Sequence, residues 1–481
     1  MNRSRFLVSS AGALTVFAIA PPARADSDVV DIALTAAPLP FQLPGGHVVP
    51  LLAYNASVPG PVMRVTRGQR IRVRYRNATN IPTSVHWHGQ VIPNAMDGVA
   101  GITQPPVLPG GSFVYEFEPA PSGTRWYHDH GFHMGMIRGL FGLFVIEDPS
   151  DEPADAEYAL VFHDISDMSS VDAALRGTSA APDIDPPGSP ERAEMPSMPG
   201  MPGMASTTPM GDMLAYRAHL VNGGIYPHAR SLPVRVGQRI RLRVLNASAA
   251  DTRYVRFAGH ALRVTHADGN RLPEAMSVDA LRVGAGERYD AYVEIAKPGA
   301  WLLQGISADP LIAQQAVAFA TDARYLATPQ SSPQTLEGVR FFTYELAGGS
   351  SARIDDRGVT KRVSLRITGG TYGDPRWMID GGVWPHTPKI SVHRGDRVLV
   401  KFTNDSDMEH PMHLHGHTFR LVEVGGTPLL RPLAKDVSLV PGAHGTSTWI
   451  FDAKAFPGRW LLHCHNEIHM MAGLMTEVVY S

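Results

Sequence analysis

The chain has 481 residues, enough for about three domains of ordinary size. Its 43 basic and 45 acidic residues nearly cancel, which excludes the positive field of a nucleic-acid-binding protein, and a hydrophobic content of 44% excludes wholesale disorder. The 46 glycines and 40 prolines, with only 18% charged residues, favour a turn-rich β protein over a helical bundle. The most unusual counts are a single cysteine, which excludes an internal disulfide, and 21 histidines.

The first 25 residues have the features of a signal peptide. Arg3 and Arg5 precede an apolar stretch, residues 7–20, that is too short to span a bilayer comfortably, and Ala23 and Ala25 form a small-x-small cleavage site. The two arginines are arranged like a twin-arginine signal with one arginine displaced, so both Sec and Tat export remain open. Because no later stretch of about 18 apolar residues occurs, we expect a periplasmic or secreted monomer without a membrane segment. An uncleaved membrane anchor is the alternative.

Three segments share one pattern. Residues 68–77, 237–246 and 395–404 each begin with glycine, carry alternating polar and apolar side chains, and end with asparagine. Such alternation is typical of a strand with one buried face, and each copy is followed by a turn, another alternating strand and a tryptophan. Short strands with regular turns indicate β-sandwiches. We therefore predict an all-β fold of three consecutive sandwich domains, near residues 29–150, 155–330 and 335–481.

The three copies differ where they carry histidine. In the first copy the tryptophan strand continues into His128-Asp129-His130, and in the third into His463-Cys464-His465, whereas Gln304 and Gly305 stand at the matching place in the middle copy. The strand therefore does not need imidazoles for its own folding, and a functional reason for them is favoured.

Ten of the 21 histidines gather in four short segments of the first and third copies. Residues i and i+2 of a strand point to the same face, so each His-x-His offers two imidazoles to one ion or ion pair. Imidazole binds zinc, copper, iron and nickel, and a thiolate with two imidazoles is typical of a blue-copper site. The other imidazoles exceed the needs of one tetrahedral zinc and suit a cluster of several coppers. The four segments are 86–88, 128–130, 410–415 and 463–469.

These segments resemble the four copper-binding signatures of the multicopper oxidases, a family that includes laccases, ascorbate oxidases and bacterial cuprous oxidases. The resemblance covers nearly the whole mature chain and includes residues 55–61, which match the family's entry motif. It implies three cupredoxin-like Greek-key domains and four coppers, of which one is type 1, one is type 2 and two are type 3. It also implies that the protein removes single electrons from a donor and reduces dioxygen to two waters.

Carried over segment by segment, the resemblance implies a role for each ligand. The type 1 copper takes His410, Cys464 and His469, and the type 2 copper takes His86 and His413. The type 3 coppers take His88, His128 and His465, and His130, His415 and His463. At the axial position of the type 1 copper, where many members have methionine, this chain has Leu474. A residue that cannot coordinate there implies a three-coordinate copper with a raised potential.

Reduction of dioxygen consumes protons, so acids are expected near the cluster. Asp97 matches the family's acid below the type 2 copper, and Glu467 matches an acid in the laccase and ascorbate-oxidase signature. Both are predicted catalytic residues. Asp129 stands between two ligands and, by strand alternation, is expected to point away from the metals and to orient its neighbours.

The donor is predicted from one insertion. Residues 183–213 are rich in proline, glycine and methionine, and similar bacterial cuprous oxidases carry a methionine-rich segment in this region. Thioethers select Cu(I). The main hypothesis is oxidation of phenols and aromatic amines, as in laccases. The alternatives are oxidation of Cu(I), or of Fe(II), in periplasmic copper tolerance, and copper sequestration without catalysis. The methionines that could bind Cu(I) are Met195, Met198, Met201, Met204, Met210 and Met213.

Overall fold

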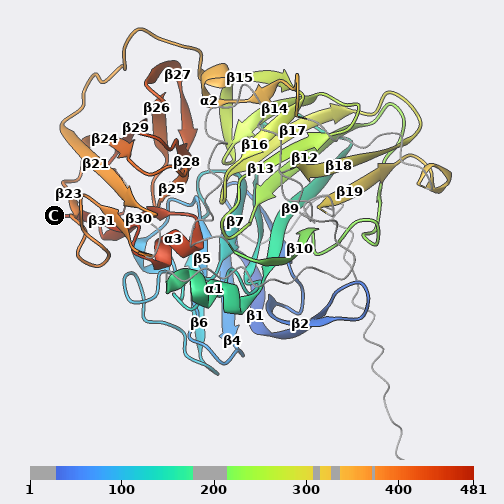
Figure 1. Ribbon diagram of the computed structural model, residues 1–481, viewed down its shortest axis with the longest axis horizontal. Helices are drawn as coiled ribbons and strands as arrows, with labels where there is room; N and C mark the ends of the chain where they lie inside the picture. Colours follow the sequence, from blue (N-terminus) through green and yellow to red (C-terminus); the bar gives the residue numbers. More distant parts are fainter. Residues whose placement is uncertain (1–28, 177–213, 307–314, 327–335, 371–373, 455) are drawn as a thin grey trace, which may run out of the picture.

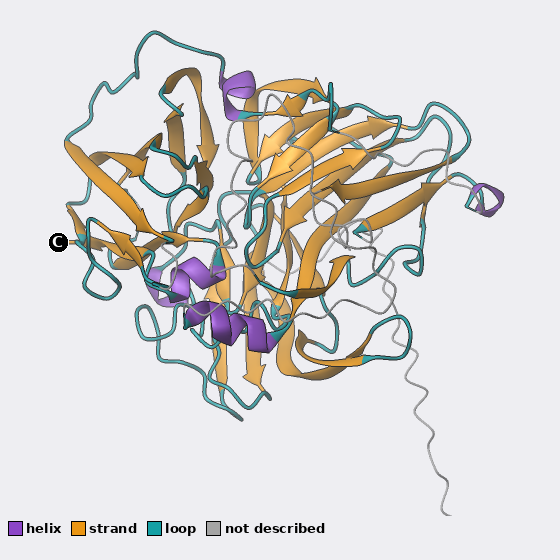
Figure 2. Ribbon diagram, in the orientation of Figure 1, coloured by secondary structure: helices purple, strands orange, loops and turns teal. Residues whose placement is uncertain are grey.

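The computed structural model describes residues 29–176, 214–306, 315–326, 336–370, 374–454 and 456–481 (Figure 1). The predicted signal peptide and methionine-rich insertion lie outside these residues. Six sheets, arranged as three pairs, hold nearly all the regular secondary structure of the described chain, which confirms the all-β fold (Figure 2). Among the described residues, no helix has both the length and the apolar character needed to cross a bilayer.

The N-terminal sandwich, the first pair of sheets, has four strands in each sheet. The first sheet has the order β2 (Val48–Tyr54), β1 (Val29–Gln42), β4 (Arg70–Asn77) and β6 (Ser112–Phe117). The second has the order β3 (Gly60–Thr66), β8 (Phe141–Glu147), β7 (Gly123–His128) and β5 (His86–His88). The short 3-10 helix η1 spans Asn94–Met96. Strand β5, the shortest of the second sheet, is its edge and carries two of the predicted ligands.

The middle sandwich has six strands in each sheet. One sheet has the order β10 (Tyr216–Val221), β9 (Ala156–Ser166), β12 (Arg239–Asn246), β17 (Arg288–Glu294), β14 (Leu262–Ala267) and β15 (Asn270–Val278). The other has the order β11 (Leu232–Pro233), β19 (Ala316–Ala320), β18 (Ala300–Ile306), β13 (Arg253–Phe257), β16 (Ala280–Val283) and β20 (Phe341–Phe342). Strand β20 lies within the range predicted for the third domain but pairs with β16 of this sandwich. The 3-10 helix η3 spans Ala323–Tyr325.

The C-terminal sandwich has a six-stranded and a five-stranded sheet. The first has the order β22 (Trp377–Ile379), β21 (Lys361–Gly369), β24 (Arg397–Asn404), β29 (Gly445–Asp452), β26 (Phe419–Val424) and β27 (Thr427–Lys435). The second has the order β23 (Ile390–Val392), β31 (Met475–Tyr480), β30 (Arg459–Cys464), β25 (His410–Leu414) and β28 (Val437–Val440). Short helices are α1 (Met168–Leu175), α2 (Tyr344–Gly348) and α3 (Glu467–Met471).

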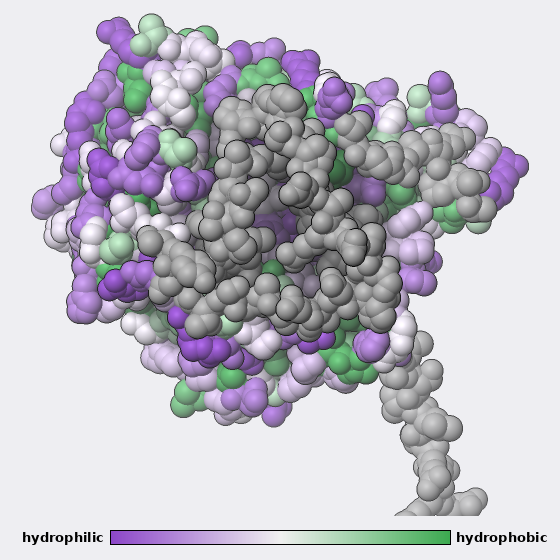
Figure 3. Space-filling view, viewed as in Figure 1, coloured by the Kyte–Doolittle hydropathy of each residue, from purple (hydrophilic) through white to green (hydrophobic). Residues whose placement is uncertain are grey.

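The three repeated strands occupy equivalent positions. Strands β4, β12 and β24 each pair in parallel with the first long strand of their sandwich, and each pairs antiparallel with a later strand on the other side. Their alternating apolar side chains enter the cores, as the sequence predicts. One hydrophobic core is continuous from the middle to the C-terminal sandwich, while the N-terminal sandwich has a core of its own. Large exposed apolar side chains, such as Val114, Val236 and Leu430, are scattered, and the described part of the face in Figure 3 is mixed in hydropathy.

The asparagine that ends each repeated strand hydrogen-bonds the backbone of nearby loops in the same way in all three sandwiches. In the middle one, Asn246 Nδ2 donates to the carbonyls of Asp251 (2.7 Å) and Val283 (2.9 Å), and its Oδ1 accepts the N–H of Ser248 (3.0 Å). Asn77 and Asn404 make the matching set of bonds. A buried amide that satisfies three backbone groups explains why asparagine recurs there.

Replacing Asn246 by alanine should destabilise the middle sandwich. Asn246→Ala leaves three buried backbone groups without partners, which costs about 2–4 kcal/mol and lowers the thermal midpoint by roughly 5–10 °C. Calorimetry of the copper-free protein measures the change, with Asn80→Ala, at an exposed position, as the control. Equal midpoints for the two variants would contradict the role given to the repeated asparagine.

Candidate metal centre

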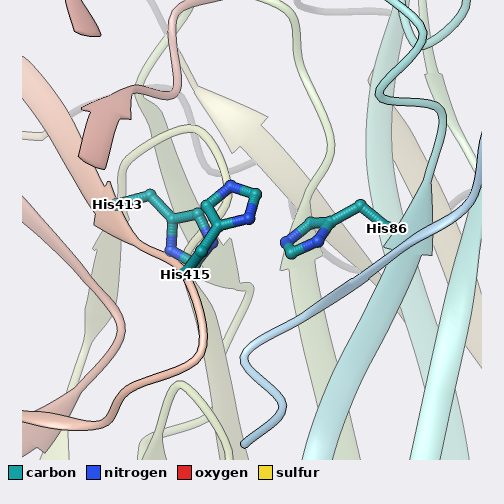
Figure 4. Close-up of side chains that lie close together, drawn as sticks. All are labelled: His86, His413 and His415. Atoms are coloured by element: carbon teal, nitrogen blue, oxygen red, sulfur yellow. The ribbon is translucent and has the colours of Figure 1, made fainter. Parts of the chain in front are cut away.

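Two pairs of adjacent strands bring the predicted ligands together. In the N-terminal sandwich β5 pairs with β7 so that His86 lies opposite His128. In the C-terminal sandwich β25 pairs with β30 so that His413 lies opposite His463. Figure 4 shows His413 and His415 on one side and His86 facing them from the other. The ten predicted histidine ligands and Cys464 are all buried, none more than 3% exposed.

One group of ligands combines the cysteine with two imidazoles. The Nδ1 atoms of His410 and His469 lie 3.1 Å apart, and each lies 3.7 Å from Sγ of Cys464. The second nitrogen of His410 hydrogen-bonds Ser406 Oγ at 2.9 Å, so its Nδ1 is directed at the sulfur. His469 is held by α3, whose first turn is capped by the Asn466 side chain. Two nitrogens and a thiol sulfur converging in this way form a trigonal donor set suited to copper.

The surroundings of this cysteine group are apolar. The ring of Trp377 packs against His469, with 4.2 Å between ring centroids, and edge-on against His410 at 4.7 Å. Leu474 is fully buried and belongs to the same hydrophobic cluster as Cys464 and Trp377, and its carbonyl accepts the N–H of Cys464 at 3.0 Å. The predicted axial position is therefore in the core and offers no donor side chain.

The other eight imidazoles lie together between the N-terminal and C-terminal sandwiches. The Nε2 atom of His463 lies 2.9 Å from Nε2 of His415 and 3.4 Å from Nε2 of His130. A second triplet, His88, His128 and His465, has ring centroids 4.9–5.7 Å apart. The ring of His86 lies 5.7 Å from that of His413 and stacks on His415 at 3.9 Å. The donor atoms of two predicted sets converge, those of His410, Cys464 and His469 and those of His130, His415 and His463, whereas the donor atom of His86 converges with those of His88 and His128 and with those of His413 and His415.

Most of these rings are fixed through the nitrogen that does not face the cluster. The backbone carbonyl of Asp97 accepts the Nδ1–H of His86, and that of Asp129 accepts the Nδ1–H of His128. In the same way, the carbonyl of Asp436 accepts the Nδ1–H of His413 and that of Cys464 accepts the Nδ1–H of His463. These four distances are 2.8–3.0 Å. The Asp97 carboxylate accepts the Nδ1–H of His415 at 2.9 Å. Partners of this kind fix the tautomer and the orientation of a metal-binding histidine.

The nitrogens that face the cluster fit bound metal ions. Within the described structure, Nε2 of His86, His128 and His413, Nδ1 of His88 and both nitrogens of His465 are buried without a hydrogen-bond partner. Buried polar atoms rarely remain unpaired, so a ligand for these lone pairs is expected. Burial also lowers the pKa of most of the ring nitrogens, well below the usual value for His88, His130 and His415 and to about 4 for His463. These four rings are therefore neutral, as metal ligands must be.

The three acids singled out from the sequence are all buried. Asp97 contacts two ligands, because its carbonyl bonds His86 and its carboxylate bonds His415. Glu467 accepts the N–H of Ile137 at 3.0 Å, and burial, reinforced by the Asp129 charge, raises its pKa to about 8. The Asp129 carboxylate binds the N–H groups of Ser84 and Gly131 and contacts no ligand ring, as strand alternation predicts; burial raises its pKa to about 6.

One carboxylate in contact with the ligands was not predicted. Asp436, between β27 and β28, accepts the Nε2–H of His88 at 3.0 Å and through its carbonyl holds His413. It belongs to none of the histidine segments. A weak signal exists in the repeat pattern, because Asp279 stands at the matching place between β15 and β16 of the middle sandwich. There it binds the N–H of Arg340.

The described residues on the two sides of the methionine-rich insertion pack against the same hydrophobic cluster. Leu175, at the end of α1, and Leu214 pack in one hydrophobic cluster with Ile468 and Met471. Ile468 and Met471 belong to α3, the helix that carries His469. The described residues flanking the insertion therefore lie beside the helix of the cysteine group (Figure 1).

Comparison with known proteins agrees with this geometry. Models of the multicopper oxidase family match residues 39–151, 200–321 and 356–481. The chain is 35% identical over 478 residues to multicopper oxidase MmcO of Mycobacterium tuberculosis, covering 98% of this chain and 91% of that protein. It is 26% identical to laccase-1 of Fomitopsis schrenkii, with 87% and 81% covered. It is 25% identical to a copper resistance protein A homolog of Pseudomonas syringae pv. tomato, with 90% and 89% covered.

The similarity extends over all three sandwiches and both groups of ligands. The cupredoxin-like folds, the four coppers and the oxidase activity expected from the sequence are those of this family. The chain belongs to the multicopper oxidases, copper-dependent oxidoreductases that oxidise a reducing substrate with dioxygen.

Proposed function

We propose that the buried cysteine and histidines divide into four copper sites. His410, Cys464 and His469 hold the type 1 copper, and His86 and His413 hold the type 2 copper. Two triplets hold the type 3 coppers, namely His88, His128 and His465, and His130, His415 and His463. The observation that carries this assignment is the tripeptide 463–465. Its cysteine lies in the trigonal group, while the histidine on each side lies in the cluster of eight.

When bound, the coppers supply one-electron oxidation of a donor at the first site and four-electron reduction of dioxygen to two waters at the second. The protein contributes a short covalent path between the sites, since Cys464 is bonded through the backbone to a ligand on each side. It also excludes water, because every proposed ligand is buried. Leu474 would offer no donor atom to a bound type 1 copper, which would favour a high potential.

We propose that Asp97 and Glu467 handle the protons that dioxygen reduction consumes. Asp97 is supported by its contacts with His86 and His415, which belong to two different proposed copper sites. Glu467 is supported by its place between two ligands, His465 and His469, at the start of α3. A carboxyl group held this close to the cluster can pass a proton without admitting bulk water.

Phenols and aromatic amines are the proposed donors, and similarity to a laccase supports them. A second candidate, Cu(I), is favoured by three observations. The methionine-rich residues 183–213 offer the soft thioethers that select Cu(I). The described residues beside that segment, Leu175 and Leu214, pack next to the helix of His469, and one relative is a copper resistance protein homolog.

The N-terminal pattern supports export with cleavage after Ala25, to the periplasm or the medium. We propose that the exported protein is a monomer. Copper sequestration without catalysis is the remaining alternative. It does not require the covalent link between the two ligand groups, which is why the oxidase is preferred.

The cluster assignment predicts different outcomes for two neighbouring histidines. His415→Gln removes a proposed type 3 ligand and should lower the copper bound per chain, with loss of dioxygen uptake. His417→Gln is the matched control, because His417 is also buried but bonds the His415 carbonyl and Tyr480 Oη. It should keep all the copper. Equal copper loss in both variants, measured by metal analysis, would contradict the assignment.

The type 1 assignment predicts that Cys464→Ser removes the intense visible blue absorption and all turnover. Serine is nearly the same size as cysteine but supplies no thiolate, so the fold should persist, as checked by circular dichroism and cooperative unfolding. A folded Cys464→Ser variant that is still blue would contradict the type 1 assignment.

The Cu(I) hypothesis predicts that the methionine sulfurs affect one donor class only. Changing all six methionines of residues 195–213 to leucine keeps the length and apolar character of the segment while removing its thioethers. Cu(I) oxidation should become several-fold slower, on the order of the 10-fold effects seen when metal-site residues are lost, while phenol oxidation stays unchanged. Parallel dioxygen-uptake assays measure both rates, and an equal loss in both would argue that the segment is only structural.

A further inference from the structure

A single carboxylate joins all three sandwiches next to the proposed cluster. The side chain of Asp436 is completely buried in the link between β27 and β28 of the C-terminal sandwich. Arg288, from β17 of the middle sandwich, donates to it in a two-pronged contact, with Nη1 2.6 Å from Oδ1 and Nη2 2.7 Å from Oδ2. Arg125, from β7 of the N-terminal sandwich, donates to Oδ2 at 3.1 Å. Asp436, Arg288 and Arg125 are called the clamp below.

The clamp also holds two proposed copper ligands. Asp436 Oδ1 accepts the Nε2–H of His88, which comes from the N-terminal sandwich, at 3.0 Å. Its carbonyl accepts the Nδ1–H of His413, from the C-terminal sandwich, at 2.8 Å. The two rings stack, with centroids 3.7 Å apart and planes 12° from parallel. The nitrogens left over, Nδ1 of His88 and Nε2 of His413, are buried atoms without a hydrogen-bond partner.

Local sequence is adapted to this close approach. Gly89 follows His88 with a φ of +79°, and a Cβ there would lie 2.5 Å from Asp436 Oδ2 and 2.7 Å from Arg288 Nη2. Any side chain would therefore push β5 away from the clamp. On the other side, Asp268 Oδ2 accepts the N–H groups of Asp436 at 3.2 Å and Val437 at 3.1 Å, so the backbone of the clamp is fixed as well.

Burying a carboxylate this deeply is unfavourable unless it is paired, and replacing a whole buried ion pair by hydrophobic groups of similar size is often as stable or more stable. One oxygen of this carboxylate and the backbone carbonyl of the same residue each accept an N–H from a histidine of the cluster, His88 and His413 respectively. We propose that Asp436 is a positioning residue for His88 and His413. Among the described residues, the middle sandwich carries no proposed copper ligand. Through Arg288 it sets the distance between the histidines of the N-terminal sandwich and those of the C-terminal sandwich. The proposal rests on the copper assignment above.

The test compares two buried carboxylates changed to amides. Asp436→Asn replaces one carboxylate oxygen by an NH₂ group, which donates where the oxygen accepted. In one orientation of the amide this group meets the N–H donors of Arg288 and Arg125, and in the other it meets those of His88 and Arg288. Asp290→Asn is the matched control. Asp290 is equally buried and is paired with Arg241, Arg243 and Thr124, and none of these is a proposed copper ligand.

Both variants are loaded with copper and titrated with a chelator, and three quantities are recorded: copper per chain, blue absorbance and the electron paramagnetic resonance of the type 2 copper. We expect Asp436→Asn to lose its non-blue copper at a chelator concentration at least about 10-fold lower than the wild-type protein needs, because losing the partner of a metal ligand weakens metal binding by about that factor. The blue absorbance should be retained. Asp290→Asn should lower the thermal midpoint but leave the chelator titration and the type 2 spectrum unchanged.

Two results overturn the proposal. One is an Asp436→Asn protein with wild-type copper retention and an unchanged type 2 spectrum, and the other is the same copper loss in both variants, which would reveal a general packing effect. If Asp436→Asn does not fold, Arg288→Lys provides the test, because lysine keeps the charge and loses the two-pronged contact. Arg288→Lys should release the non-blue copper at lower chelator concentration, and wild-type retention would again overturn the proposal. A wild-type protein that lacks the non-blue coppers would instead refute the copper assignment itself.

Discussion

An imidazole buried away from water needs partners for its ring nitrogens, and ten such rings are buried here. In most of them the N–H is bonded to a backbone carbonyl or a carboxylate, for example His86 to Asp97 and His463 to Cys464. The lone pairs of His86, His128 and His413 remain buried and unpaired in the protein alone. The fold therefore buries these lone pairs without a protein partner, and a bound metal ion would coordinate them.

This arrangement requires two sheets to meet with their histidine-bearing strands facing each other. Each half of the cluster is built within one sandwich by strand pairing, because His86 lies opposite His128 and His413 opposite His463. Strand pairing cannot fix the distance between the halves. That distance depends on contacts between sandwiches, and the buried contacts of Asp436 with Arg288 and Arg125 lie at the boundary where the three meet. This is why we propose that the middle sandwich shapes the site, although none of its described residues is a proposed ligand.

The sequence predicted the parts of the site that depend on local periodicity. Pairs such as His86 and His88 share a face because strands have a period of two, and comparison of the repeats separated these residues from the scaffold. The roles of the individual ligands, of Asp97 and of Glu467 came from family resemblance and stay predictions. The family, the fold class and the need for copper are confirmed by similarity along the chain.

Other features could not be predicted because they depend on contacts between distant residues. Asp436 is 348 residues from His88 and 311 from Arg125, and no motif surrounds it. Strand β20 joins the middle sandwich by pairing with β16 across the predicted domain boundary, and two aromatic residues give no periodicity to read. The burial of Glu467 follows from its contact with Ile137 in the N-terminal sandwich, which sequence spacing does not reveal.

The central claim is that one chain holds two linked ligand groups, a trigonal site with a thiolate and a separate cluster of imidazoles. Metal analysis of the wild-type protein together with its visible spectrum tests this most directly. The account predicts four coppers per chain, as in the family, with one of them responsible for a blue absorption that disappears on reduction and returns with dioxygen. One or two coppers per chain, or a copper-loaded protein without the blue absorption, would contradict it.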